Sequence, residues 1–152
     1  MSLKDQIKLD QTEAMRSRDQ LRLSTLRMVG AAIQYAEVAG DRAATLTDDQ
    51  VMDVLRSEAK KRIEAADLFE QAGRAESALK ERAELVLIQA YLPAAMSDAD
   101  LATVVTEEVA NAAAGGAAGG KAVGAVIKAV RDRVGNLADG QRISSAVKAA
   151  LA

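Results

Sequence analysis

The chain contains a single proline, Pro93, in a sequence that otherwise has helical patterning almost throughout. Proline lacks an amide proton and disfavours helical geometry at the residue before it, so the helix leading to Pro93 is expected to stop there. Ser97 is a favourable N-cap, and Asp98 suits the positive end of a helix dipole, so a new helix is expected to begin there. The sequence therefore predicts two helical domains, residues 1–93 and 94–152.

The composition favours an all-α fold. Alanine, leucine, glutamate, lysine and arginine are frequent, and runs of β-branched residues are short. A chain of 152 residues is long enough to form a hydrophobic core without disulfides or metal ions. The chain has no cysteine and no histidine, which excludes disulfides, thiolate zinc sites and a histidine general base. No carboxylate cluster has the spacing of metal ligands. We therefore expect no catalytic residue, no metal site and no cofactor.

No stretch approaches the roughly 20 apolar residues needed to cross a bilayer, and the N-terminal ten residues do not have the pattern of a signal peptide. We expect a cytoplasmic protein with no membrane partner. The formal net charge is −2, but it is unevenly distributed. Residues 94–120 carry four acids and no base, whereas residues 121–152 carry six bases and two acids. The last segment is the only basic part of the chain, and a basic segment favours polyanionic partners.

Capping signals and apolar spacing predict a four-helix portion before the proline, with helices starting near residues 2, 19, 47 and 75. The third helix has the strongest start signal, because Thr47 and Gln50 have the spacing of a capping box. Its middle contains Glu58 and Arg62, which are expected to form a helix-surface ion pair. The fourth helix repeats apolar residues at spacings of 4, 3 and 4, and this face is expected to be buried: Leu79, Ala83, Val86 and Ala90.

A three-helix bundle is predicted after the proline. Residues 111–120 are four-tenths glycine and are expected to form a mobile Gly/Ala-rich loop between the first and second of these helices. The second helix is expected to begin near Gly120, and the third is capped by Asp139. The second helix is expected to bury an aliphatic stripe: Val123, Ile127, Val130 and Val134.

Two short motifs resemble catalytic or nucleotide-binding sequences, and both lack the required context. Gly115 to Lys121 matches part of a phosphate-binding loop, but Ala122 stands where a serine or threonine must bind magnesium, and the preceding segment is helical in pattern. A flexible linker is the favoured interpretation. Ser57 and Lys60 have the spacing of a serine acyl-transfer motif, but the accompanying elements are absent. An ordinary charged helix surface is favoured there.

The strongest candidate site is a basic face on the second helix of the C-terminal bundle. At about 100° per residue, Lys121, Gly124, Lys128 and Arg131 fall within one arc opposite the predicted aliphatic stripe. Gly124 has no side chain, so a phosphate backbone can approach closely. Arg142 is a candidate to extend this surface. The alternative is that the lysines only solubilise a small helix and that Gly124 only permits close helix packing.

Several stretches together resemble the GatB/YqeY family, which contains stand-alone YqeY-like proteins similar to the C-terminal tail of the glutamyl/aspartyl-tRNA amidotransferase B subunit. The resemblance covers essentially the whole chain. The stretches that carry it are Arg27–Ile33, Lys61–Arg62, Phe69, Ala72–Arg74, Glu84, Tyr91–Pro93, Gly120–Lys128 and Ala138–Gly140. The family implies a four-helix portion followed by a three-helix portion. The helix end expected at Pro93 indicates the same division.

The resemblance also implies a function. In the amidotransferase, the similar tail grips the body of the tRNA while other domains perform the chemistry. Carried over to this sequence, tRNA contact falls on Lys121, Gly124 and Lys128, and the turn at Asp139 and Gly140 presents Arg142. We therefore expect a non-catalytic tRNA- or RNA-binding protein. The alternatives are a protein-interaction accessory of the amidotransferase or of the translation machinery, and a carbon–nitrogen ligase by family label only.

Overall fold

The structure is a computed structural model that describes residues 1–117 and 119–152, and these residues form helices and connecting segments without any strand. The all-α prediction is confirmed. The chain divides into two compact units, Met1–Pro93 and Ala94–Ala152, which are compatible with the expected four-helix and three-helix portions.

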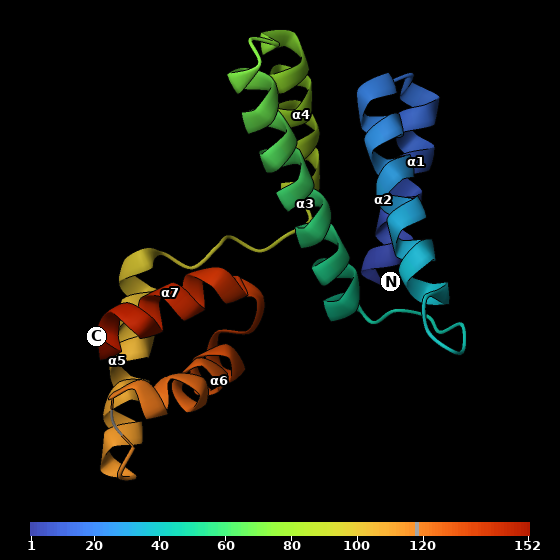
Figure 1. The fold of residues 1–152 in the computed structure, drawn as a ribbon. Helices are drawn as coiled ribbons and strands as arrows, with labels where there is room; N and C mark the ends of the chain where they lie inside the picture. The colour runs from blue at the N-terminus through green and yellow to red at the C-terminus, as the bar shows by residue number, and fades with distance from the viewer. Residues whose placement is uncertain (118) are drawn as a thin grey trace. The chain divides into compact units, whose positions relative to one another are not determined.

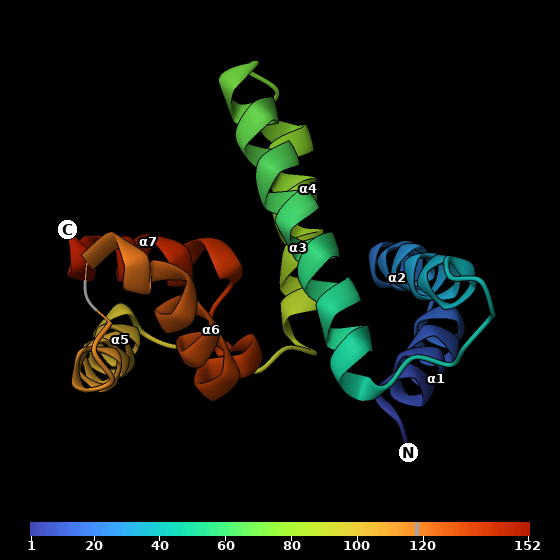
Figure 2. The ribbon, with the colours of Figure 1, turned by 60° about the horizontal axis from the view of Figure 1, so that its bottom comes forward.

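The first unit consists of two helical hairpins. In each hairpin the two helices lie side by side (Figures 1 and 2), α1 with α2 and α3 with α4. The helices are α1 (Leu3–Ser17), α2 (Gln20–Val38), α3 (Asp48–Gln71) and α4 (Ala75–Gln89). Their starts follow from local chemistry, since Ser2 and Thr47 each form a capping box with the residue three positions later. Gly73 ends the turn after α3 with a φ of 74°, a conformation that favours glycine.

Aliphatic side chains from all four helices form the core of the first unit. These are Ile7, Leu26, Val29, Ile33, Val51, Leu55, Ala59 and Ile88. The expected inward face of α4 was wrong: Leu79 is 67% exposed and Val86 is 65% exposed. The helix instead buries Ala78, Glu84 and Ile88. Because α4 is apolar on more than one side, its spacing alone does not determine which side the other helices cover.

Three buried charged side chains meet where α3 contacts α4. They are Glu58, Arg62 and Glu84, and we call them the ionic cluster. These residues are 7%, 4% and 5% exposed, respectively. The Arg62 guanidinium donates from Nη1 to the Glu58 carboxylate, and its Nε lies 3.4 Å from Glu84 Oε2. The expected surface ion pair of Glu58 and Arg62 was therefore wrong, because α4 covers it and brings a second carboxylate.

Hydrogen bonds keep Glu58 ionised within this cluster. Burial raises the pKa of Glu58, but hydrogen bonds from Lys61 and Arg62 outweigh burial and hold the pKa below its ordinary value. Lys61 is itself largely exposed and places its Nζ 2.9 Å from Glu58 Oε1. Two cations and two carboxylates thus meet at the contact between α3 and α4, which offsets the cost of burying charge.

The second unit is a three-helix bundle of α5 (Asp98–Ala114), α6 (Val123–Val134) and α7 (Gly140–Leu151), with 3-10 turns at η1 (Gly119–Ala122) and η2 (Gly135–Leu137). Ser97 and Asp139 cap α5 and α7, as predicted. The core contains Leu101, Val105, Ala122, Val126, Val130, Val134, Ala138, Ile143 and Val147.

The expected loop over residues 111–120 was too long at both ends. Helix α5 continues to Ala114, and η1 begins at Gly119. Ala112 and Ala117 pack against the core of the unit. Alanine is the strongest helix former, so the glycine-free part of this segment extends α5. Ala118 lies outside the described residues.

The buried stripe of α6 is rotated from the one expected. Val126 joins Val130 and Val134 in the core, whereas Val123 and Ile127 are partly buried at its edge. The prediction was right for Val130 and Val134. Val123 and Ile127 lie on the same broad aliphatic side of the helix, but at its edge.

Candidate nucleic-acid interface

Gly124, Lys128 and Arg131 form a ridge along the exposed side of α6. Their spacing of four and three residues places them on one side of the helix. All three are exposed, and Lys128 has an 82% exposed side chain. The buried residues Val126 and Val130 occupy the other side of the same helix. The helix therefore presents a polar ridge to solvent while its aliphatic side forms the core.

Lys121 lies just before this ridge, in η1, and its side chain is also exposed. Helix α6 begins at Val123 and has no side-chain cap at its N-terminus. The first amide groups of a helix carry a partial positive charge. Lys121 thus adds positive charge at the N-terminal end of α6. We call Lys121, Gly124, Lys128 and Arg131 the α6 basic face.

Among the described residues, one carboxylate lies within 4 Å of a cation of the α6 basic face. Asp132 Oδ2 is 3.9 Å from Lys128 Nζ, and both side chains are largely exposed. Such an exposed pair is worth little and does not remove the positive charge of the surface. The Arg131 guanidinium lies over the start of α7, where a Cβ placed on Gly140 would be 3.3 Å from Arg131 Nη2. Glycine at position 140 thus leaves room for this side chain.

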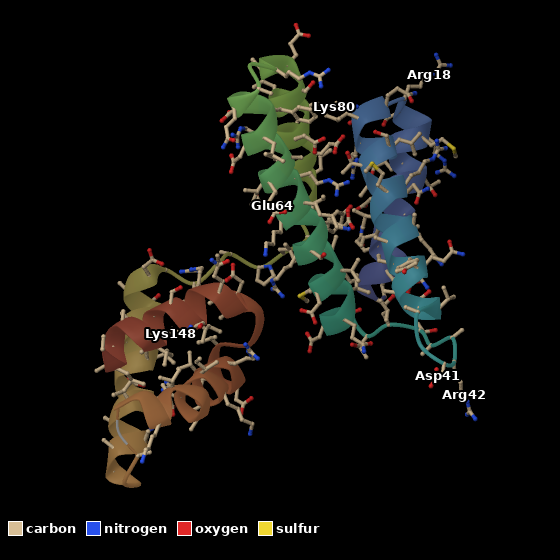
Figure 3. The ribbon with its side chains drawn as sticks, in the orientation of Figure 1. Arg18, Asp41, Arg42, Glu64, Lys80 and Lys148 are labelled. Atoms are coloured by element: carbon tan, nitrogen blue, oxygen red, sulfur yellow. The ribbon has the colours of Figure 1, made fainter. Side chains whose placement is uncertain are left out.

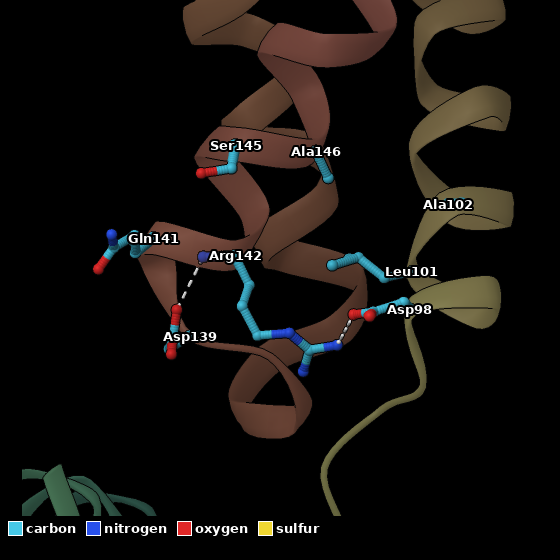
Figure 4. Close-up of a pocket in the computed structure, with 8 residues that line it drawn as sticks. All are labelled: Asp98, Leu101, Ala102, Asp139, Gln141, Arg142, Ser145 and Ala146. Carbon is cyan, nitrogen blue, oxygen red and sulfur yellow. Dashed lines mark hydrogen bonds and ion pairs between the residues drawn. The ribbon is translucent and has the colours of Figure 1, made fainter. Parts of the chain in front are cut away.

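The Arg142 guanidinium is engaged within the second unit. Its Nη2 donates a hydrogen bond to Asp98 Oδ1 at 2.8 Å, at the start of α5 (Figure 4). The same Nη2 donates to the Met96 carbonyl oxygen, also at 2.8 Å. The backbone amide of Arg142 donates to Asp139 Oδ1. The guanidinium thus joins α7 to the beginning of α5.

A shallow groove of about 530 Å³ lies beside Arg142, between α5 and α7. Its charged lining residues are already engaged, because Asp139 caps α7 and Asp98 pairs with Arg142. On α7, Lys148 is exposed on the surface of the second unit (Figure 3).

Within residues 1–117 and 119–152, no group of three or more acidic side chains is placed to hold a metal ion. None of the described helices combines the length and the apolar character required to cross a membrane.

These features define an all-α protein made of two helical units, with an exposed basic face on one helix of the second unit. A family model described as "Yqey-like protein" matches residues 4–151, and the chain belongs to this family. The resemblance to YqeY-like proteins is thereby confirmed. A search among curated proteins finds no significant match.

Proposed function

We propose that this protein is a non-catalytic RNA-binding protein that engages tRNA through the α6 basic face. The observation that supports the proposal most directly is the exposed ridge of Gly124, Lys128 and Arg131, opposite the aliphatic side of α6. Its positive charges suit phosphate oxygens, and a Cβ placed on Gly124 would meet nothing within 4 Å. A phosphate backbone can therefore approach the helix closely at this point.

The composition indicates how such binding would work. Aromatic residues make up 2% of the chain, so base stacking is not expected to dominate. The formal net charge is −2, so attraction to RNA must come from a local surface. Recognition would then depend on the shape of the folded RNA and on phosphate contacts, which are weakened by salt. Arg142 is left out of the proposed surface because its guanidinium is engaged at the start of α5.

The test is a salt titration of tRNA binding with the whole 152-residue chain. The variant K121Q/K128Q removes two charges from the α6 basic face. It is expected to reduce the slope of log K against log salt concentration by about 1–2 units, because each lost phosphate contact contributes somewhat under one unit. The matched control K60Q/K80Q removes two exposed lysine charges from the first unit. If K121Q/K128Q binds as the control does at every salt concentration, the α6 basic face is not the interface.

A second candidate is a protein-interaction accessory of the amidotransferase or of another translation protein. The exposed apolar residues of α4 favour it, because Leu79 and Val86 lie two helical turns apart on one side of the helix. The region around Tyr91 is less suited to bind a partner protein, because Tyr91 packs against the core of the first unit and donates a hydrogen bond to Asp10. This candidate predicts a co-purifying protein that survives nuclease and high salt, and that L79Q/V86Q releases.

A further inference from the structure

A groove of about 300 Å³ lies between α1 and α2, and sequence reasoning did not identify it. Lys8 and Gln11 line it from α1, and Arg27, Gly30 and Gln34 line it from α2. Gly30 leaves the groove open, since a Cβ placed there would already lie 3.8 Å from Gln11 Oε1 and a longer side chain would fill the space. The groove belongs entirely to the first unit and is separate from the α6 basic face.

The lining of this groove has donors and cations but no carboxylate. Besides Lys8 and Arg27 it contains Lys4, whose ammonium is 2.6 Å from Glu37 Oε1 and is therefore already paired. Among the described residues, Lys8 and Arg27 have no carboxylate within 4 Å, and both are exposed.

Two acidic groups that interact electrostatically with Lys8, Asp5 and Glu37, are themselves engaged. Asp5 accepts from Ser2 in the capping box of α1, and Glu37 accepts from Lys4 and from the Leu46 amide. They reduce the positive potential at Lys8 without closing the groove. The groove is thus lined by one such cation from each helix, and the amide side chains of Gln11 and Gln34 belong to the same lining.

We propose that the groove between α1 and α2 is a second phosphate-binding surface, which takes phosphate groups of the RNA backbone. Arg27 on one wall offers a planar, multidentate donor, and Lys8 on the other offers a compact charge, a combination that suits phosphate oxygens. The amides of Gln11 and Gln34 supply further donors. This inference rests on the proposed function, because it assigns a second contact to the same RNA.

The test uses the whole 152-residue chain, total tRNA and inorganic tripolyphosphate. The variant K8Q/R27Q removes the two unpaired cations, and the matched control R18Q/K60Q removes one arginine and one lysine charge from exposed positions of the same unit (Arg18 is labelled in Figure 3). For K8Q/R27Q we expect the slope of log K against log salt concentration to fall by about 1–2 units, and for the control by less than half as much. Tripolyphosphate is expected to shift the amide resonances of Gly30 and Gln11.

A second variant, G30L, fills the groove without changing its charge. It is expected to weaken tRNA binding while preserving thermal stability, since glycine to leucine improves helix propensity. If K8Q/R27Q and G30L both bind tRNA as the control does while K121Q/K128Q is weakened, the groove proposal is overturned and the proposed function stands. If only the groove variants weaken binding, the groove stands and the α6 basic face fails. Wild-type protein that binds no tRNA at any salt concentration overturns both, and a tripolyphosphate shift at Gly30 would then indicate a small phosphorylated ligand instead.

Discussion

Arg62 of α3 and Glu84 of α4 meet inside the first unit, with Nε and Oε2 3.4 Å apart and both residues almost entirely buried. Removing Arg62 leaves the carboxylates of Glu58 and Glu84 buried without the cation that they share. We expect R62A to lower the free energy of unfolding of this unit by about 3–5 kcal/mol, as measured by chemical denaturation.

Two further variants distinguish charge from packing in the ionic cluster. E58M/R62M/E84M replaces all three groups by apolar side chains and is expected to recover most of the lost stability. K61Q removes the largely exposed neighbour and is expected to cost less than about 1 kcal/mol. Equal losses for R62A and K61Q would contradict a structural role for the buried pair.

The first unit is expected to lose stability on acidification. The folded-state pKa of Glu58 lies below its ordinary value of 4.5, so this carboxylate contributes stability above that pH. That contribution is lost as the pH falls through the lowered folded-state value. Denaturation midpoints measured between pH 7 and pH 3 should therefore fall at the acidic end. E58Q is expected to flatten this dependence, whereas E64Q, at an exposed position of the same helix (Figure 3), is expected to keep it.

Arg142 is expected to stabilise the second unit and not to bind RNA directly. R142Q removes the guanidinium bonds to Met96 and Asp98, and should cost about 1 kcal/mol, since these contacts are partly exposed. Hydrogen exchange should accelerate at the first turn of α5. K148Q, on the same helix, serves as the control and should leave that exchange unchanged. If R142Q lost affinity for tRNA while hydrogen exchange at the first turn of α5 stayed unchanged, Arg142 would be part of the RNA-binding surface.

Substitutions of Gly124 are expected to affect the stability of the second unit and its binding of tRNA in opposite directions. A Cβ at this position meets nothing within 4 Å, and alanine is favoured over glycine in a helix by about 1 kcal/mol. G124A is therefore expected to raise the unfolding midpoint of the second unit. If a phosphate group approaches the helix here, the same variant should weaken tRNA binding, and G124L should weaken it further. Unchanged affinity in G124L would remove Gly124 from the proposed surface.

We propose that the two compact units are separate domains. The described residues that form the core of the second unit all lie between Met96 and Leu151, so residues 94–152 have a core of their own. This segment expressed alone is expected to give a dispersed amide spectrum that overlays on that of the whole chain. A collapsed spectrum with narrow dispersion would show that the second unit depends on the first.

Helix starts were predictable because capping is local. Ser2, Asp19, Thr47, Ser97 and Asp139 each accept a backbone hydrogen bond from the residue three positions later, and their side chains alone indicate this. The end of α5 was less predictable, because the alanines before Gly115 extend the helix into a segment whose overall composition indicates a loop.

Contacts between helices were the part that sequence reasoning missed. The buried side of α4 depends on α2 and α3, which the apolar spacing of α4 does not encode. Arg142 was expected to extend the basic surface, and its contacts with Met96 and Asp98, which lie far away in the sequence, could not be predicted from spacing. The groove containing Lys8 and Arg27 was missed for the same reason, since its two walls come from different helices. Within α6, by contrast, periodicity was enough to predict that Lys128 points away from the core.

The ionic cluster also sets the alignment of α3 against α4. A hairpin held together by alanine and leucine alone can slide by one helical turn, about 5.4 Å, and still bury aliphatic surface. The same slide here would carry the Glu84 carboxylate away from the Arg62 guanidinium and leave that carboxylate without its cation. The charged residues therefore favour the one alignment of α3 and α4 in which Glu84 lies beside Arg62.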